Sequence, residues 1–409
     1  WDWNVEAGAT TVHYTSWKEM MPNKNVTDRF DQYSKTTNFA GALAWKDCGM
    51  FGAEFDQDDS WGSLRFVPTN LTFKKSVYAF DGMLISLGSN ISASGAYGDD
   101  MITATNLFQG IDSEVSGDLV VNGETMAAGA EAKTNDSSAD LWMVTPQGTG
   151  YFVPQGNDPI IIKHGEQSSP NETGDNVDDP VTVTAAKAYI NHGVKTSGKE
   201  YVFVAVPATN ATDMAELAAK MANKGGEIFE IKAQNEKLHA LAYKPAKVTA
   251  YSIFTAVDGL NFGRLKSTAS EMLLMEKPGV NDKMLSLAIS NPNLRPQKDG
   301  NDPEGKRWIA TPTQTSIVLD GEWVLNGDAI DGVTITPQSD KTTKIDLTLT
   351  EGEPVYIDLV DKDAVGITTV DQSEQAHVYT AGHDVFVVNA VGTAMVYDVA
   401  GQVIKSVDV

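Results

Sequence analysis

The stretch GALAWKDCGMFGAEF, residues 41–55, places four chemically different side chains next to one another. Trp45 offers an aromatic ring, Lys46 a cation, Asp47 a carboxylate and Cys48 the only thiol of the chain. Glycine and alanine surround them, as is typical where strands approach closely. The stretch therefore has two interpretations. It is either a corner of an active site or a crowded strand pair whose turn carries an ordinary surface carboxylate beside Lys46.

Histidines and acidic loops give weaker signals of chemistry. None of the six histidines has a zinc-ligand spacing, which argues against a metal site. His13 and His192 lie near predicted strand ends, where a hydrogen-bonded structural role is more common than acid/base work. The acidic run at 56–59 lacks the following glycine and distal glutamate of an EF-hand, so we expect a solvated loop there, and we expect the same of DGNDPEG at 299–305. No cofactor is implied.

Tryptophan is concentrated early in the chain, at positions 1, 3, 17, 45 and 61. Aromatic rings stack on the CH groups of sugars, so exposed tryptophans would indicate carbohydrate binding. Core packing is the competing interpretation, and we favour it for at least half of them. Phosphate-binding loops, G-x-S-x-G elbows and dinucleotide fingerprints do not occur, which disfavours kinase, hydrolase and dehydrogenase functions.

Length and charge narrow the class of protein. A chain of 409 residues is long enough for two or three domains. The formal net charge of −24 disfavours nucleic acid and demands local cations if the ligand is an acidic polymer. A single cysteine excludes an internal disulfide framework. No apolar run is long enough to predict a membrane span.

Short strands separated by Gly, Asn, Asp and Pro turns predict an all-β fold. In residues 73–91, Val77 and Ala79 alternate with Tyr78 and Phe80 before an Asp81-Gly82 hairpin turn. The run YVFVAVP at 201–207 is apolar on both faces, which predicts a strand between two layers. Thr/Val/Ile-rich strands from residue 311 onward predict a second sandwich. Residues 164–180 and 291–307 are polar and turn-rich, and we expect exposed excursions there.

One helix is predicted at 213–224. Asp213 is its expected N-cap, with Glu216 three residues later, and Gly225-Gly226 its expected end. Its expected apolar face consists of Met214, Leu217, Ala218 and Met221.

Several segments, in this order, resemble the β half of chondroitin ABC-type lyases of polysaccharide lyase family 8. They are WDWNVEAGATTVH (1–13), NFAG (38–41), KKSVYAFDGMLISLGSNIS (74–92), TNLFQG (105–110), GTGYFVPQG (148–156) and YVFVAVP (201–207). The resemblance covers roughly residues 1–360. It implies a large antiparallel supersandwich at 1–245, a smaller sandwich at 246–368 and a β tail at 369–409.

The resemblance also implies a reaction. Lyases of this family cleave glycosaminoglycans such as chondroitin sulfate, dermatan sulfate and hyaluronan by β-elimination, which leaves an unsaturated uronate. Their tyrosine, histidine and arginine side chains lie in an α/α toroid that precedes the β half. The expectation is therefore a C-terminal part of a lyase, inactive alone, whose partners are the acidic polysaccharide and the missing toroid.

The family places an active-site glutamate in the loop that matches residues 41–52. In this chain the glutamate aligns with Trp45, Lys46 or Asp47, and only Asp47 is an acid. Asp47 and Lys46 are thus the candidate catalytic residues implied by the resemblance, and Trp45 is a candidate substrate-binding residue. An aspartate is one methylene shorter than the glutamate, and a displacement of about 1 Å can cost on the order of 100-fold in rate.

The tail at 392–409 resembles the C-terminal β-module of secreted and surface proteins, with VYDVAGQVIKS as its core. It implies an extracytoplasmic location, and the chain start, WDWN, is expected for a mature or excised segment. A rival from another class is a non-catalytic carbohydrate-binding or scaffold protein that kept the fold. A third reading, a sugar mutarotase or the sandwich of a glycoside hydrolase, rests on fold analogy alone.

Overall fold

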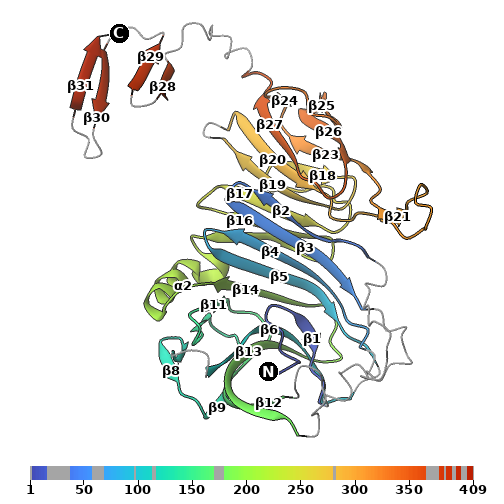
Figure 1. The fold of residues 1–409 in the computed structure, drawn as a ribbon, viewed down its shortest axis with the longest axis vertical. Helices are drawn as coiled ribbons and strands as arrows, with labels where there is room; N and C mark the ends of the chain where they lie inside the picture. Colours follow the sequence, from blue (N-terminus) through green and yellow to red (C-terminus); the bar gives the residue numbers. More distant parts are fainter. Residues whose placement is uncertain are drawn as a thin grey trace.

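The structure is a computed structural model in which almost every element is a β-strand (Figure 1). It describes residues 2–15, 37–57, 69–95, 98–112, 117–169, 179–279 and 282–364, together with strand segments at 377–381, 384–388, 393–397 and 403–408. All paired strands are antiparallel, and the predicted all-β class is confirmed.

The largest sheet has nine strands in the order β2-β3-β4-β5-β14-β11-β10-β7-β8. Their bounds are β2 Ala40–Trp45, β3 Cys48–Asp56, β4 Thr72–Phe80, β5 Met83–Ser92, β14 Lys199–Val206, β11 Gly150–Val153, β10 Leu141–Val144, β7 Leu119–Val121 and β8 Glu124–Met126. The predicted hairpin joins β4 to β5: Asp81 and Gly82 both have positive φ (46° and 75°), as a tight two-residue hairpin turn requires.

A five-stranded sheet covers one face of the nine-stranded sheet. Its order is β1-β6-β13-β12-β9, with β1 Thr10–Val12, β6 Ile102–Ile111, β13 Val181–Val194, β12 Ile160–Ser169 and β9 Ala130–Asn135. Ile160 and Ile190 of this sheet meet Phe203 and Met143 of the larger sheet in one buried cluster.

A seven-stranded sheet covers the opposite face. Its order is β15-β16-β17-β19-β20-β27-β24, with β15 Phe229–Gln234, β16 Leu238–Tyr243, β17 Val248–Ile253, β19 Met272–Pro278, β20 Met284–Ser290, β27 Val355–Asp361 and β24 Trp323–Leu325. Phe80 and Val204 pack there against Tyr243 and Met275. Residues Phe203 and Val204 of β14 therefore enter different cores, which confirms that this strand lies between two layers.

A four-stranded sheet closes the stack by covering the outer face of the seven-stranded sheet. Its order is β18-β23-β26-β25, with β18 Leu265–Thr268, β23 Thr313–Asp320, β26 Thr342–Leu349 and β25 Val333–Pro337. Ile317 and Ile345 bury against Tyr251 and Leu274. The strands after residue 311 divide between these two sheets: β23, β25 and β26 lie in the four-stranded sheet, and β24 and β27 lie in the seven-stranded sheet. The molecule is thus a stack of four sheets, with the five-stranded sheet near the bottom of Figure 1 and the four-stranded sheet near the top.

Three strand pairs lie outside the stack. The ladder of β21 Gln297–Lys298 with β22 Trp308–Ile309 projects from the second sandwich, and the tail forms the pairs β28 His377–Ala381 with β29 Asp384–Val388 and β30 Thr393–Tyr397 with β31 Val403–Asp408 (Figure 1).

The helix α2, Ala211–Gly225, corrects the predicted cap. The N-cap is Asn210, whose side-chain oxygen accepts from the backbone N–H groups of Thr212 and Asp213 at 3.0 Å each. Asp213 lies inside the first turn and accepts from the Asn210 amide at 2.7 Å. The short amide side chain reaches both free N–H groups, so the helix starts two residues earlier than predicted. The predicted apolar face is confirmed, because it packs into the core between the nine- and seven-stranded sheets.

The excursion predicted at 164–180 is wrong for residues 164–169. They continue β12 and pair with β13 as far as Ser169 opposite Val181. His164 is buried in this sheet. Its ring bonds Met126 O at 2.6 Å and Asp112 Oδ2 at 2.8 Å, and these polar partners compensate for the loss of water. Residues 170–178 lie outside the described part of the chain.

The boundary predicted between residues 245 and 246 falls in the turn that joins β16 to β17. These strands pair from Leu238 opposite Ile253 to Tyr243 opposite Val248, so one sheet continues across this point. The division into 1–245, 246–368 and 369–409 stays a prediction.

Candidate functional site

The candidate residues lie at the tip of the β2–β3 hairpin, which we call the 45–48 tip after its residues Trp45 to Cys48. Trp45 pairs with Cys48, so the turn consists of Lys46 and Asp47 alone, and both are exposed. Lys46 has φ 55°, a left-handed conformation that costs a side-chain-bearing residue about 1 kcal/mol or more. Two flanking strands hold this turn, so the Asp47 carboxylate is presented on a rigid support.

Trp45 anchors the tip to the core. Its side chain is 7% exposed and packs between the nine- and seven-stranded sheets, while the Lys46 ammonium lies 5.7 Å from the ring centroid. The buried ring leaves little surface for a sugar, so its role here is to fix the turn. Direct binding of substrate by Trp45 stays a prediction.

Cys48 adds no nucleophile to the tip. Its Sγ lies 3.7 Å from Asp47 Oδ1, and burial together with the Asp47 charge raises the pKa of the thiol. A thiol with a raised pKa stays protonated and is a weak hydrogen-bond donor.

Other turns gather around the 45–48 tip. The Tyr243 hydroxyl, at the end of β16, donates to Asp81 Oδ2 at 2.5 Å, and its ring stacks on Phe80 at 4.5 Å. Burial and this bond to Asp81 raise the pKa of Tyr243. Lys277, near the end of β19, is close enough to affect Cys48 electrostatically. Lys244 donates to Gly226 O at 2.5 Å, so this end of the sheets lies beside α2 (Figure 1).

The four histidines with described side chains are engaged in hydrogen bonds away from the tip. His13 Nε2 bonds Asn106 at 2.9 Å, and His192 bonds Asp158 and Thr105 at 2.8 Å each. The predicted hydrogen-bonded environment of both rings is confirmed. No three His, Cys, Asp or Glu side chains within the described residues are arranged to hold a metal ion.

His239, in β16, bridges the nine- and seven-stranded sheets. It bonds Ser76 and Ser89 at 2.8 Å each, and burial lowers its pKa to about 3. Its ring is therefore neutral and structural at any physiological pH.

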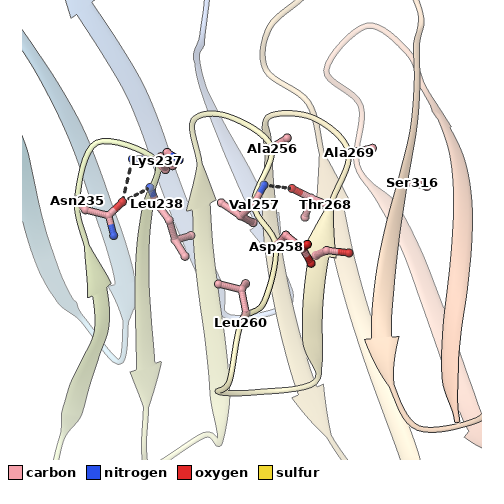
Figure 2. Close-up of a pocket in the computed structure, with 11 residues that line it drawn as sticks. Asn235, Lys237, Leu238, Ala256, Val257, Asp258, Leu260, Thr268, Ala269 and Ser316 are labelled. Atoms are coloured by element: carbon pink, nitrogen blue, oxygen red, sulfur yellow. Dashed lines mark hydrogen bonds between the residues drawn. The ribbon is translucent and has the colours of Figure 1, made fainter. Parts of the chain in front are cut away.

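A groove of about 630 Å³ opens at the other end of the sheets, between the seven- and four-stranded sheets (Figure 2). Its lining includes the β15–β16 turn, where Asn235 Oδ1 accepts from the backbone N–H of Lys237 at 2.9 Å. The Ser89 hydroxyl donates to Asn235 O, which places this turn beside the end of β5 that is remote from Asp81. The lining contains one cation, Lys237, and one carboxylate, Asp258, and no aromatic ring. No residue of this lining carries a motif that marks it as a site in the sequence.

The comparison with known families identifies the family of this stack of sheets. The model of the super-sandwich domain of polysaccharide lyase family 8 matches residues 1–218. The chain belongs to this family. The chain is 24% identical over 325 residues to the chondroitin sulfate ABC endolyase of Proteus vulgaris. This alignment covers 79% of the chain and 29% of that protein. It is 26% identical over 350 residues to the chondroitin sulfate ABC exolyase of Bacteroides thetaiotaomicron, with 79% and 31% covered.

Solved lyases share the fold. A Paenibacillus xanthan lyase superposes with a TM-score of 0.64 at 17% identity, over 97% of this chain and 34% of that one. A chondroitinase AC lyase superposes with a TM-score of 0.61 at 17% identity, over 87% and 44%. At such identities the likeness concerns the fold alone. The chain spans about a third of the length of its curated family 8 relatives.

Within this family 8 chain, the structure brings Trp45, Lys46 and Asp47 together at one tip. Of the tryptophans singled out from the sequence, Trp3 is half-buried and Trp45 buried, while 1, 17 and 61 lie outside the described residues. In the acidic run at 56–59, the side chain of Gln57 accepts from Thr69, and residues 58 and 59 lie outside the described part. Sequence reasoning missed Trp308, which is 58% exposed and follows two basic residues, Lys306 and Arg307.

Proposed function

We propose that this chain is the β-sandwich part of a lyase that cleaves uronate-containing glycosaminoglycans: chondroitin sulfate, dermatan sulfate or hyaluronan. Its family is a lyase family, and the relatives include proteins named chondroitin sulfate ABC endolyase, chondroitin sulfate ABC exolyase and hyaluronate lyase. The substrate class is drawn from these names. The single observation in this chain that carries an active-site role is the exposed carboxylate of Asp47 on a rigid hairpin tip.

The reaction sets the demands on the site. A base removes the proton on the carbon α to the uronate carboxylate, and the electron pair of that C–H bond forms a carbon–carbon double bond. The bond to the glycosidic oxygen then breaks, and an acid protonates the leaving oxygen. Charge accumulates on the carboxylate during proton removal, so catalysis needs donors or cations near it and a general base near the carbon.

In this proposal Asp47 is a positioning residue. Its carboxylate accepts hydrogen bonds from the catalytic side chains of the toroid and holds them at the reacting carbon. Lys46, the neighbouring exposed cation, contacts an anionic group of the substrate, and Trp45 holds the turn in place. The positive φ of Lys46 is the ordinary geometry of a two-residue hairpin turn, and the support for this role is the exposure of the Asp47 carboxylate at the tip.

We further propose that the catalytic tyrosine, histidine and arginine come from an α/α toroid and that this chain alone is inactive. Two observations support this. The described histidines are engaged in hydrogen bonds with buried or partly buried neighbours, and a chain with net charge −24 repels a sulfated polymer over most of its surface. An extracytoplasmic location belongs to the same proposal, because the substrate is a large extracellular polymer. Among the described residues, no helix has the length and apolar character needed to cross a bilayer.

The test is the ultraviolet absorbance of unsaturated uronate when chondroitin sulfate is incubated with the chain alone and then with a family 8 toroid segment added. We expect turnover only in the second case. Turnover by the chain alone would overturn the assignment of the catalytic groups to the toroid.

A second candidate is a non-catalytic carbohydrate-binding protein with the same fold. The exposed Trp308 favours it, because an indole ring in solvent can stack on a sugar. No turnover with a toroid shown to be folded, together with intact polysaccharide binding, would favour this candidate over the lyase.

A further inference from the structure

The most exposed tryptophan with a described side chain lies on a projecting ribbon. We call residues 294–309 the ribbon; it carries β21 and β22 and extends away from the four-sheet stack (Figure 1). Trp308 is 58% exposed there, and Leu294 and Ile309 of the same ribbon are also exposed. An exposed indole on a projecting element is accessible to a ligand that can stack on it.

A cation is held against this tryptophan. Lys298 is directly opposite Trp308 in the ladder, and its ammonium lies 4.5 Å from the ring centroid. The same ammonium donates to Gly305 O at 2.8 Å, which uses one of its three hydrogens. Donors therefore remain for an anion next to the ring, and the cation–π contact fixes both groups relative to each other.

The loop that joins the two ribbon strands is organised before any ligand binds. Asp302 accepts from the backbone N–H groups of Glu304, Lys306 and Arg307 at 3.0, 2.7 and 2.7 Å. These bonds lower the pKa of Asp302, so its carboxylate stays charged at neutral pH. A ribbon that is already ordered loses little conformational entropy when it binds.

The charge of the ribbon differs from that of the chain. It contains four basic and three acidic residues, whereas the chain has 31 basic and 55 acidic residues. All three of its acids are occupied within the ribbon: Asp299 binds the Arg307 guanidinium at 2.5 Å, Glu304 binds the Lys306 ammonium at 3.0 Å, and Asp302 binds backbone N–H groups. Arg295 is held by Glu271, outside the ribbon, at 2.6 Å. An anion approaching this chain therefore meets less repulsion here than over most of the surface.

We propose that Trp308 and Lys298 form an accessory binding site for an anionic polysaccharide. The indole contacts the CH groups of a sugar ring, and the Lys298 ammonium binds the carboxylate or sulfate of that sugar or its neighbour. The ribbon follows β20 on the side where Pro292 contacts the start of β2, so the site lies at the opposite end of the sheets from Asp47. The choice of an acidic polymer as the ligand rests on the proposed function. The exposure of the Trp308 ring and the position of the Lys298 ammonium are observed independently of it.

Binding of the 409-residue chain to chondroitin sulfate, hyaluronan and neutral dextran, measured by affinity electrophoresis without a toroid, tests this proposal. We expect Trp308→Ala and Lys298→Ala each to weaken binding of chondroitin sulfate by about tenfold, as loss of one ring or ion contact predicts. Lys195→Ala removes an equal charge from an exposed Asp99 pair elsewhere and should leave binding unchanged. Hyaluronan carries carboxylates without sulfates, so an equal loss with it would assign the carboxylate as the ligand of Lys298. A loss confined to chondroitin sulfate would assign the sulfate, and both results support the site.

Three outcomes would overturn the accessory site. They are wild-type affinity in Trp308→Ala, no binding of any anionic polymer by the wild-type chain, and dextran binding as tight as that of chondroitin sulfate. A melting curve for each variant shows that the chain is folded, as expected for a residue in solvent. Because turnover is not measured, absence of lyase activity with the toroid would count against the proposed function and leave this result standing.

Discussion

Gly41 and Gly52 lie directly opposite each other in the β2–β3 ladder, where Gly41 faces Pro292 just after β20 and Gly52 faces β19 of the seven-stranded sheet. A Cβ atom at Gly41 would lie 2.6 Å from Pro292 Cβ, and one at Gly52 would lie 2.8 Å from Leu273 Cδ2. Glycine is thus what allows this hairpin to approach the neighbouring layer. Crowding explains the glycines of the stretch, and its turn exposes Asp47 to solvent. A role for Asp47 in an active site stays a prediction.

We expect Gly52→Ala to destabilise the fold by about 1–3 kcal/mol, because the added methyl overpacks a buried site. Gly49→Ala is the matched control, since its Cβ would meet no described heavy atom closer than 3.8 Å. Urea unfolding of both variants measures the difference. Equal stability of the two would show that the layers separate easily at this hairpin.

Phe80 should be among the costliest side chains to truncate. It is 1% exposed, stacks on Tyr243 and packs between the two largest sheets. Phe80→Ala should cost about 3–5 kcal/mol in the free energy of unfolding. Phe55→Ala, at a ring that is 41% exposed, should cost much less. A melting curve that Phe80→Ala leaves unchanged would contradict the packing between these sheets.

Asp47→Asn, in an enzyme that contains the toroid, should reduce kcat by on the order of 100-fold with little change in KM, because misplaced catalytic groups act on the chemical step. The melting temperature should not change, since Asp47 is exposed. Asp47→Glu should retain more activity than Asp47→Asn, because the carboxylate is kept although it moves by one methylene. Asp99→Asn, another exposed carboxylate, is the control.

Wild-type turnover in Asp47→Asn would remove Asp47 from the active site. A loss of stability that parallels the loss of rate would instead assign it a structural role in the turn.

Acid should destabilise the chain through His13. Its ring is buried and faces Asn106, Asp2, Lys187 and Lys163, and burial is the main cause that lowers its pKa to about 4. Between pH 6.5 and about 4 the unfolded chain binds a proton that the folded chain does not, so stability falls as pH falls through this window. Above pH 6.5 this histidine has no effect on the pH dependence.

Comparison with His13→Gln isolates this contribution. Stability of the wild type should fall more steeply by up to about 1.4 kcal/mol per pH unit between pH 6.5 and 4. Glu276 has a pKa raised by burial and acts in the opposite direction in both proteins, so the difference between the two curves is the measurement. If the two curves of stability against pH are parallel, His13 binds its proton as readily in the folded chain as in the unfolded chain, which would contradict this prediction.

The sequence by itself determined the strands and the tightest turns of this protein. The alternation in 77–80, the Asp81-Gly82 turn and the doubly apolar β14 follow from backbone geometry and from the two faces of a strand, which are local properties. The acid at position 47 and the family resemblance were likewise visible without coordinates.

Only the tertiary structure decided which face of each strand packs against which neighbouring sheet. From the sequence, His164 is predicted to lie in a polar loop. In the structure it lies in a sheet, where Asp112 and Met126, distant in the chain, form hydrogen bonds with its ring. Trp45 and Trp308 have the same side chain, yet one anchors a turn in the core and the other stands in solvent. Burial depends on partners that are remote in sequence, such as Ser76 and His239, which lie 163 residues apart. Local pattern defines an element, and these long-range contacts decide what each of its side chains can touch.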